Sequence, residues 1–374
     1  MLTAIVGVNW GDEGKGRMVD LLSERCDVVV RYQGGNNAGH TVVNDRGRFI
    51  LNLMPSGILR EGTVNVLGPG MVIDLEHLCG EVARLREGGI SVTPENLKIS
   101  DRATICMPYH KLLDELEEDR LAGKKFGSTR RGIAPVYADK YMKKTLRMGD
   151  LLDLEAQREH LADIVEWKNL TVERGYGHAP IRAEDMMAWL REFGLPWRDY
   201  ICDVTGYLNG AIDQGKDIIF EAQLGALRDI DFGIFPYTSS SSSIAAYAPV
   251  GAGIPGRHLD RSIGIMKAYS SCVGEGPFTC EFFGGEAHAL REAGGEYGAA
   301  TGRPRRVGGF DVVASRYGVM VQGATEIALT KLDVLSGMEK VPVLDYIAYL
   351  EKAVNCPIKY VSVGAERDAY IEMF

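Results

Sequence analysis

Short apolar runs rich in β-branched residues alternate along this chain with longer stretches whose apolar positions recur at helical spacing. Buried parallel strands are continuous apolar runs, and helices connect them, so the alternation predicts an α/β fold around a large, mainly parallel sheet with helices on both faces. The predicted strands are Ala4–Val8, Val28–Tyr32, Val64–Leu67, Asp217–Phe220, Ile263–Tyr269, Glu326–Leu332 and Ile358–Val363. The predicted helices include Leu75–Glu87, His110–Leu121, Leu154–Val172 and Ala183–Phe193.

The segment from Leu152 to Gly210 is helical by its pattern of apolar positions. No internal repeat divides the chain, and its length suits one large domain or two smaller ones. We therefore expect a single domain over residues 1–374 with a helical subdomain at about 150–210.

Composition limits the partners and the location. The 374 residues carry a net charge of −9, which argues against broad nucleic-acid binding. No apolar run approaches the roughly 18 residues of a membrane span, and the first residues have the pattern of a strand and not of a signal peptide. The seven cysteines include no C-x-x-C pair, which favours reduced thiols. We expect a cytoplasmic protein without a nucleic-acid or membrane partner.

The first candidate site is the loop Trp10–Gly16, which follows the first predicted strand. Its glycines let backbone N–H groups approach a phosphate, the helix that begins after it adds favourable partial charge, and Lys15 suits phosphate oxygens. The carboxylates of Asp12 and Glu13 do not suit a phosphate unless one binds Mg²⁺ or accepts a proton. The loop therefore indicates more than simple anion binding.

A second glycine loop, Gln33–Thr41, follows the strand Val28–Tyr32 and contains the side-chain amides of Gln33, Asn36 and Asn37 together with His40. The alternative interpretation is a hairpin turn, which Gly-Asn sequences favour. Because both loops follow strands of the predicted parallel sheet, we expect that His40 can face Asp12 across the carboxyl edge of that sheet.

Three further segments carry residues that suit anionic groups. Phe126–Gly132, with three lysines shortly after it, suits a monophosphate, although a solvated basic face would have the same composition. Gly298–Arg306 contains arginines that can bind a carboxylate or phosphate in a bidentate manner. Thr238–Ser243 is either a flexible polar loop or, because it follows a strand exit, part of an active site.

The segment Thr330–Asp333 ends an apolar strand with a lysine and an aspartate. A carboxylate can accept hydrogen bonds from both N1–H and the 2-amino group of guanine, whereas adenine has an acceptor at N1 and no 2-amino group. The lysine stem can lie across the plane of the base. The segment resembles the guanine-reading Lys-x-Asp element of GTPases.

Taken together, these segments resemble the adenylosuccinate synthetase family, whose members join L-aspartate to IMP with GTP. The resemblance implies a P-loop-like GTP-binding topology and a 6-phosphoryl-IMP intermediate, with adenylosuccinate, GDP and phosphate as products. It also implies Mg²⁺ as a cofactor and a homodimer. The matching segments are Trp10–Gly16, Arg31–Thr41, Pro55–Arg60, Gly127–Lys140, Phe220–Ser240, Lys267–Tyr269, Gly298–Arg305, Thr330–Asp333 and Ser362–Gly364.

The resemblance implies a role for each matching residue. Asp12 would remove the N1 proton of IMP and ligate Mg²⁺ with the carbonyl of Gly39; His40 would be the general acid, and Lys15 would neutralise the transferring phosphate. The implied GTP contacts are Gly11, Asp12, Glu13, Gly14, Lys15, Gly16, Arg17, Gly39, His40, Thr41, Arg305, Lys331, Leu332, Asp333, Ser362, Val363 and Gly364. The implied IMP contacts are Asn37, Ala38, Thr129, Lys143, Gln223, Leu224, Ser239 and Arg303, and the implied aspartate contacts are Ala299, Ala300, Thr301, Gly302, Arg303 and Arg305.

Two departures from the family pattern bear on the IMP contacts. Lys143 stands where the family has an arginine that reaches the IMP phosphate of the neighbouring subunit, so a bidentate contact would become a point charge. The family's Glu-Gly-Ala-Gln-Gly is Glu221–Gly225 here, with Gln223 one place early, and on a strand such a shift reverses the face of the side chain. Either a bulge restores Gln223, or another residue contacts the base.

Two other functions remain open at this point. A phage-type relative acts on dGMP and makes a 2-amino product, but that branch replaces the Asp12 carboxylate with a hydroxyl residue, and Asp12 is intact here. A GTP-binding regulatory module would bind nucleotide without synthesis, and it would need neither His40 nor the pair Arg303 and Arg305.

Overall fold

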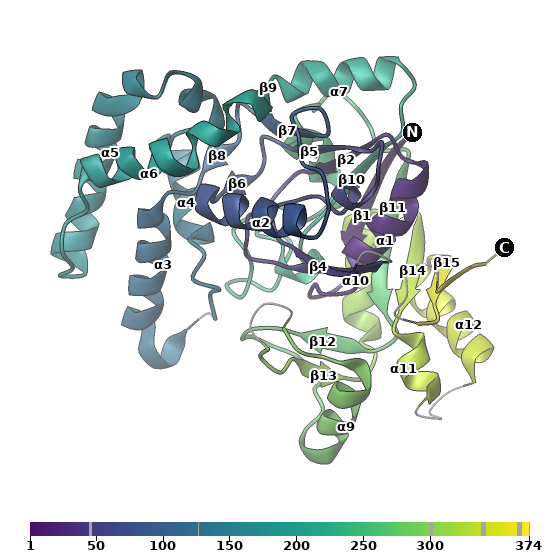
Figure 1. The fold of residues 1–374 in the computed structure, drawn as a ribbon. Coiled ribbons are helices and arrows are strands. Elements are labelled where there is room, and N and C mark those ends of the chain that lie inside the picture. The colour runs from purple at the N-terminus through teal and green to yellow at the C-terminus, as the bar shows by residue number, and fades with distance from the viewer. Residues whose placement is uncertain (45–46, 126, 299–301, 338–341, 365–368, 374) are drawn as a thin grey trace.

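A computed structural model describes residues 1–44, 47–125, 127–298, 302–337, 342–364 and 369–373. Within these ranges, ten strands form one sheet in the order β16-β15-β14-β11-β1-β10-β2-β5-β7-β9, and every neighbouring pair is parallel except β15 and β16 (Figure 1). The strands are β1 (Leu2–Gly7), β2 (Val28–Arg31), β5 (Val64–Leu67), β7 (Leu97–Ser100), β9 (Ile201–Cys202), β10 (Ile218–Glu221), β11 (Arg261–Lys267), β14 (Glu326–Thr330), β15 (Ile358–Ser362) and β16 (Tyr370–Glu372). The predicted α/β fold and the seven predicted strands are confirmed.

Three short strand pairs lie outside this sheet. They are β3 (His40–Asn44) with β4 (Gly47–Leu51), β6 (Val72–Ile73) with β8 (Thr104–Ile105), and β12 (Ser270–Cys272) with β13 (Arg306–Gly308). The helices are α1 (Lys15–Leu22), α2 (Leu75–Glu87), α3 (Pro108–Leu121), α4 (Ile133–Met142), α5 (Arg158–Asn169), α6 (Ala183–Phe193), α7 (Val204–Asp213), α8 (Ala248–Ala252), α9 (Gly284–Gly294), α10 (Val312–Gln322), α11 (Leu332–Gly337) and α12 (Val343–Val354).

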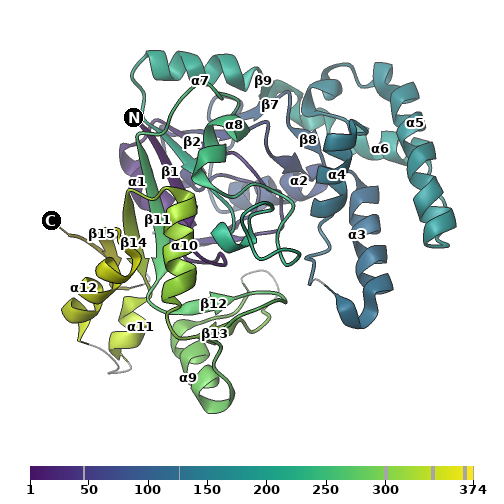
Figure 2. The same cartoon turned by 180° about the vertical axis from the view of Figure 1, so that it is seen from behind.

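Helices cover both faces of the sheet, as the alternation of runs predicts. On one face, Met18 of α1 is buried in a cluster with Ile5 and Val29. On the other face, Phe220 of β10 is buried in a cluster with Leu208 of α7. Figure 2 shows α7, α8 and α10 on this second side. The two layers bury the central strands completely, which explains their continuous apolar sequence.

The helices α5 and α6 lie in the segment predicted as a helical subdomain, at the end of the molecule farthest from β15 (Figures 1 and 2). Leu161 of α5 and Leu190 of α6 share a hydrophobic cluster with Ile99 of β7. The helices therefore pack onto the same core as one end of the sheet. The division into a domain and a subdomain stays a prediction.

Two further findings concern membrane spans and cysteines. Among the helices of the described ranges, none is long and apolar enough to cross a membrane. All seven cysteines are free.

The parallel strands β1, β2, β10, β11 and β14 all end at the same edge of the sheet, so the loops that follow them meet there.

Candidate active site

The loop that follows β1 turns through left-handed backbone at three positions. Gly11 has φ 100°, Asp12 has φ 59°, and Gly14, which precedes α1, has φ 99°. Glycine adopts positive φ without steric cost, and aspartate tolerates it better than most residues. The Asp12 carboxylate is 30% exposed, and its Oδ2 lies 3.0 Å from Nη2 of Arg305. The first predicted site is thus an open turn at the carboxyl edge of the sheet.

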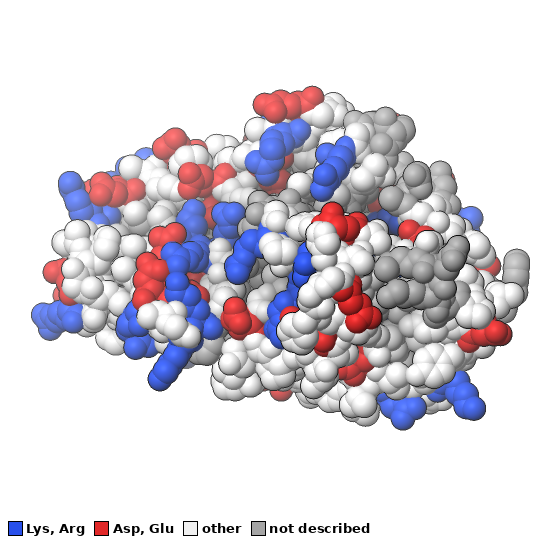
Figure 3. Space-filling model, turned by 90° about the horizontal axis from the view of Figure 1, so that it is seen from below, with Lys and Arg blue, Asp and Glu red and all other residues white. Residues whose placement is uncertain are grey.

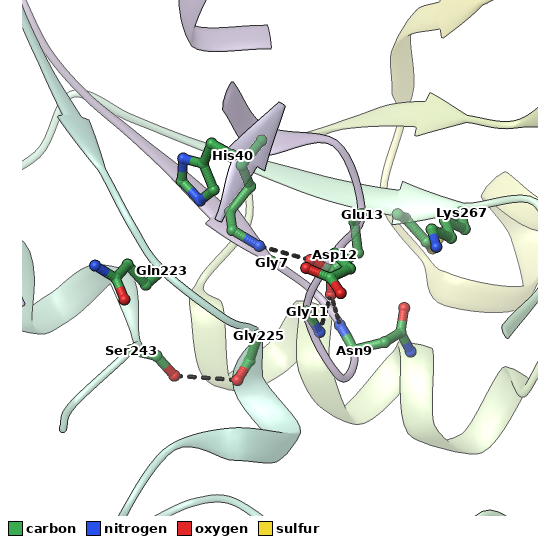
Figure 4. A network of polar contacts seen from close by, with 12 residues as sticks. Gly7, Asn9, Gly11, Asp12, Glu13, His40, Gln223, Gly225, Ser243 and Lys267 are labelled. Carbon is green, nitrogen blue, oxygen red and sulfur yellow. Dashed lines mark hydrogen bonds and ion pairs between the residues drawn. The ribbon is translucent and has the colours of Figure 1, made fainter. Parts of the chain in front are cut away.

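Glu13 and Lys15 of the same loop are buried as an ion pair. Oε2 of Glu13 lies 2.7 Å from Nζ of Lys15, and each side chain is 2% exposed. Oε1 of Glu13 accepts hydrogen bonds from the backbone N–H groups of Gly11 at 2.8 Å and Asn9 at 3.1 Å (Figure 4). A Cβ atom at Gly7 would lie 2.5 Å from this carboxylate, so only glycine fits beneath it. Glu13 therefore fixes the loop backbone and balances the charge of Lys15.

His40, the first residue of β3, is held by a carboxylate from β10. Its Nδ1 lies 2.5 Å from Oε1 of Glu221. Ser56 donates its N–H to Oε2 and its hydroxyl to Oε1 of Glu221, each at 2.7 Å. Burial opposes ionisation of Glu221, but hydrogen bonding to His40 and Ser56 and the charge of Arg31 lower the pKa of this carboxyl. Burial lowers the pKa of His40, so the ring donates Nδ1–H to an ionised Glu221 and leaves Nε2 for a ligand.

The two glycine loops are in direct contact. A Cβ atom at Gly16 would lie 2.7 Å from Cβ of His40, which places the imidazole against the first turn of α1. In the view of Figure 4, His40 lies on one side of the loop after β1 and Lys267 on the other, with Asp12 between them. Figure 3 looks at this edge of the molecule, where Lys and Arg side chains gather around a hollow.

The predicted guanine contacts come together at the ends of β14 and β15. Arg17 of α1 donates from Nη1 to the hydroxyl of Ser362 at 2.9 Å, and its guanidinium lies 4.6 Å from the ring centre of Tyr370. Ser362 in turn donates to the carbonyl of Gly364 at 3.2 Å. The first turn of α1 is thus tied to the segment after β15. Val363, which lies between Ser362 and Gly364, is exposed.

The Lys-x-Asp segment departs from its prediction as the end of a strand. β14 ends at Thr330, and Leu332 begins α11 with Asp333 in its first turn. Lys331 between them has φ 63°, and this left-handed residue turns the chain from strand to helix. The predicted strand Glu326–Leu332 was therefore too long at its end. Nζ of Lys331 donates to the carbonyl of Gly294 at 2.8 Å.

Gln223 is fully buried beside the second glycine loop. Its side-chain amide donates to the carbonyl of Gly35 at 2.6 Å, and its Oε1 has no hydrogen-bond partner in the described part of the chain. β10 ends at Glu221, so the alternation of faces along a strand does not apply to Gln223, contrary to our expectation. Leu224 follows at φ 60°, in a left-handed turn against the loop after β1. Which of the two contacts a base stays a prediction.

The other predicted IMP and aspartate contacts are divided between several loops. Asn37, Ala38, Gly39 and Thr41 lie in the second glycine loop and at the start of β3, and the hydroxyl of Ser239 is buried with no partner among the described residues. Thr129 and Lys143 are exposed at opposite ends of the segment that contains α4, and neither forms a hydrogen bond or ion pair with the loop after β1 in the described chain. Gly302 and Arg303 are exposed, and the predicted contacts Ala299, Ala300 and Thr301 lie outside the described residues.

Sequence reasoning assigned no role to three charged residues of this site. Glu221 holds His40, and Glu296 accepts a hydrogen bond from Nη1 of Arg305 at 2.8 Å and lies 2.8 Å from Nζ of Lys267. The one signal in the sequence is a charged residue at the end of an apolar strand run, as for Glu221 after Phe220 and Lys267 after Met266.

Comparison with known proteins decides the family. The family model described as adenylosuccinate synthetase matches residues 4–345. The chain is 48% identical over 337 residues to adenylosuccinate synthetase 2 of Pseudoalteromonas translucida, and the aligned residues cover 90% of this chain and 79% of that relative. It is also 48% identical over 351 residues to the adenylosuccinate synthetase of Pelotomaculum thermopropionicum, with 94% and 82% covered. The chain belongs to the adenylosuccinate synthetase family.

Solved structures agree with this assignment. The fully ligated adenylosuccinate synthetase of Plasmodium falciparum superposes with a TM-score of 0.91 at 30% identity and covers 100% of this chain and 99% of that chain. A cyanophage S-2L succinoaminodeoxyadenylate synthetase, bound to dGMP and dATP, superposes with a TM-score of 0.71 at 21% identity, with 99% and 95% covered, and shows only a shared fold. As a member of this family, the chain is a GTP-dependent ligase that forms a C–N bond between IMP and L-aspartate in purine biosynthesis.

Proposed function

We propose that Asp12 is the general base of this synthetase and removes the N1 proton of IMP. Its carboxylate is partly exposed at the carboxyl edge of the sheet, in a loop whose glycines and following helix suit phosphate groups. Removal of the proton places negative charge on O6, which attacks the γ-phosphate of GTP and releases GDP. The amine of L-aspartate then displaces phosphate from C6 of the purine.

His40 is the proposed general acid. Its Nδ1 is committed to Glu221, so Nε2 is the atom that can hold a proton near the phosphates. Bound phosphates add negative charge beside Nε2, and Glu221 adds it beside Nδ1, so both favour the protonated ring when the substrates are present. Lys15 and the loop N–H groups neutralise the transferring phosphate, and release of Lys15 from Glu13 would allow this contact.

Mg²⁺ fits this site as an ion shared with the substrates. The proposed protein ligands are the carboxylate of Asp12 and the carbonyl of Gly39, both hard oxygen donors. Among the described residues, no group of three or more His, Cys, Asp or Glu side chains could hold a metal. Mg²⁺ commonly binds through one or two carboxylates together with phosphate oxygens and water, which agrees with so few protein ligands. When bound, the ion supplies neutralisation of charge on the phosphates.

We assign recognition of guanine, IMP and L-aspartate to the loops around this edge of the sheet. Asp333 reads N1–H and the 2-amino group of guanine, supported by its place beside Lys331 at the end of β14. Arg303 and Arg305 hold the carboxylates of L-aspartate through bidentate contacts. The remaining proposed contacts are Gly11, Glu13, Gly14, Gly16, Arg17, Thr41, Leu332, Ser362, Val363 and Gly364 for GTP, Asn37, Ala38, Thr129, Gln223, Leu224 and Ser239 for IMP, and Ala299, Ala300, Thr301 and Gly302 for aspartate.

A homodimer completes the proposed site. Lys143 is the exposed C-terminal cap of α4, with φ 60°. It has no ion-pair partner among the described residues of its own chain, so its charge is available to a phosphate bound by another subunit. We assign it to the IMP phosphate of the partner.

The observation that carries this proposal is the meeting of Asp12, the His40–Glu221 pair and the Lys331–Asp333 turn at one edge of the sheet. Purified protein supplied with GTP, Mg²⁺, L-aspartate and either IMP or dGMP tests it, with products identified by mass spectrometry. We expect adenylosuccinate from IMP. Turnover of dGMP alone would assign the chain to the phage-type reaction, and binding of GTP without any product would indicate a regulatory module.

A further inference from the structure

A buried ion-pair network lies behind Arg305, and the proposed reaction gives it no role. Glu296, two residues after α9, has no exposed surface. Its two carboxylate oxygens lie 2.8 and 2.9 Å from Nζ of Lys267, and its Oε1 accepts a hydrogen bond from the hydroxyl of Tyr269 at 2.6 Å. Lys267 also donates to the hydroxyl of Ser271 at 2.5 Å. Lys267 and Tyr269 thus both donate to Glu296.

The charges of this network balance. Burial opposes ionisation of Glu296, but the charges of Lys267 and Arg305 outweigh it and lower the pKa of this carboxyl to about 2. Lys267 and Arg305 contribute two positive charges, and Glu296 and Asp12 contribute two negative charges. Removal of one buried member therefore leaves an uncompensated charge, which is costly in a protein interior.

Arg305 is shared between the two carboxylates. Its Nη1 lies 2.8 Å from Oε2 of Glu296, and its Nη2 lies 3.0 Å from Oδ2 of Asp12. The backbone N–H of Arg305 also donates to the carbonyl of Glu296 at 2.9 Å. Because Glu296 holds Arg305 by both main chain and side chain, the second guanidinium nitrogen is directed at the loop after β1.

Glu296 and Arg305 also close the base of the segment that carries the proposed aspartate contacts. Just beyond them, Tyr297 and Pro304 form an isolated antiparallel bridge, and the N–H of Gly298 donates to the carbonyl of Arg303 at 2.8 Å. The anchor of this segment is therefore the Lys267–Glu296 pair at the end of β11.

The same anchor touches the guanine side of the site. A Cβ atom at Gly294 would lie 2.3 Å from the hydroxyl of Tyr269. Glycine is therefore required at this position for the hydroxyl to reach Glu296. The carbonyl of Gly294 accepts the hydrogen bond from Lys331. The end of α9 thus lies between β11, the turn after β14 and the base of the aspartate segment.

We propose that Glu296, held by Lys267 and Tyr269, is a positioning residue that sets Arg305 and the base of the aspartate segment in the geometry that binds the amino-acid substrate. The inference rests on the proposed roles of Arg303 and Arg305. A carboxylate of L-aspartate would meet a guanidinium whose direction is already fixed, so little freedom is lost on binding. The Lys267–Glu296 pair acts through Arg305 and does not touch the substrate.

Three variants separate positioning from mere stability. Glu296→Gln removes one of the two negative charges and leaves one positive charge of the network uncompensated, so we expect a lower Tm and a KM for L-aspartate raised about tenfold, the effect of losing one charged hydrogen bond. The double variant Lys267→Met with Glu296→Gln restores the balance of charge, so Tm should recover. The KM for L-aspartate should stay raised, because Arg305 still lacks its carboxylate partner. KM for IMP should stay within about twofold of the wild type.

Glu166→Gln, a change at an exposed carboxylate of α5 that forms no ion pair among the described residues, is the control and should leave the KM values for IMP, GTP and L-aspartate unchanged. If the single Glu296→Gln variant does not fold, Tyr269→Phe removes one hydrogen bond to Glu296 without changing any charge, and it should raise the KM for L-aspartate with kcat little affected. Recovery of this KM together with Tm in the double variant would overturn the inference, as would a parallel rise of all three KM values. A wild-type protein that makes no adenylosuccinate would instead overturn the proposed function.

Discussion

Nδ1 of His40 lies 2.5 Å from Oε1 of Glu221, a carboxylate with no exposed surface. The same carboxylate is fixed by two hydrogen bonds from Ser56, so it cannot turn away from the imidazole. The pair joins the start of β3 to the end of β10 and leaves Nε2 as the ring nitrogen that is open to a ligand. His40 is therefore oriented before any substrate binds.

Glu221→Gln should lower kcat by about 10- to 100-fold, the usual effect of losing a residue that orients a functional histidine. It should also shift the basic limb of the kcat profile to lower pH. The negative charge of Glu221 favours the protonated ring, whereas burial and the positive charges of Arg31 and Lys15 oppose it, so loss of that charge lowers the pKa of His40 further. The measurement is kcat against pH at saturating substrates. An unshifted basic limb would show that His40 is not the acid.

The buried Glu13–Lys15 pair makes a prediction about stability. Glu13→Gln leaves Lys15 without a partner and weakens the hydrogen bonds that Glu13 accepts from Gly11 and Asn9. Loss of one member of a buried pair costs about 3 to 5 kcal/mol of unfolding free energy. Denaturant unfolding checks this value. Glu24→Gln, at an exposed carboxylate just after α1, is the control and should change the free energy by less than about 0.5 kcal/mol.

Asp333→Asn should change the choice of nucleotide. Oδ1 of asparagine can still accept from N1–H, but its Nδ2 donates where the carboxylate accepts, so the variant loses its contact with the 2-amino group of guanine and sets two donors against each other. We expect kcat/KM for GTP to fall about 10- to 100-fold, because the lost hydrogen bond involves a charged group. XTP, which has a carbonyl in place of the 2-amino group, should become the better substrate. Unchanged preference for GTP over XTP would contradict the assignment of Asp333.

Lys143 tests the shared site of the proposed dimer. Lys143→Ala should raise the KM for IMP, since a phosphate loses one positive charge. If Lys143 acts on the partner's site, a mixture of Lys143→Ala and Asp12→Asn subunits should form some dimers with one site that has both residues, and activity should exceed that of either variant alone. If the subunits exchange and the activity of the mixture does not rise above that of either variant, Lys143 acts in the site of its own chain.

Much of the fold follows from the sequence, because the central strands are buried on both faces and therefore have continuous apolar runs. Val28–Val30 of β2 and Ile218–Phe220 of β10 are examples. The edge strands β9 and β16 have only two and three residues, too few for a periodic pattern, and neither was predicted. The turn at Lys331 was also missed, since a left-handed lysine has no signature in the sequence.

The site was predictable where its chemistry lies in local motifs, as in the loop around Asp12. It was not predictable where a residue acts through a distant partner. Glu221 and His40 are 181 positions apart, and Glu296 and Lys267 are 29 apart. A charge at the end of an apolar run, as at Glu221, does not identify its partner, and the function of each carboxylate becomes visible only when the fold brings the two residues together.

If Asp12 activates O6 of IMP to receive the γ-phosphate of GTP, that oxygen must leave with the phosphate. Turnover of IMP labelled with oxygen-18 at O6 measures this, with the label followed by mass spectrometry in the released phosphate. We expect the label to enter phosphate with the wild type, and Asp12→Asn to transfer it about a thousandfold more slowly while it remains folded. Unlabelled phosphate, or transfer by Asp12→Asn at the wild-type rate, would show that Asp12 does not activate O6.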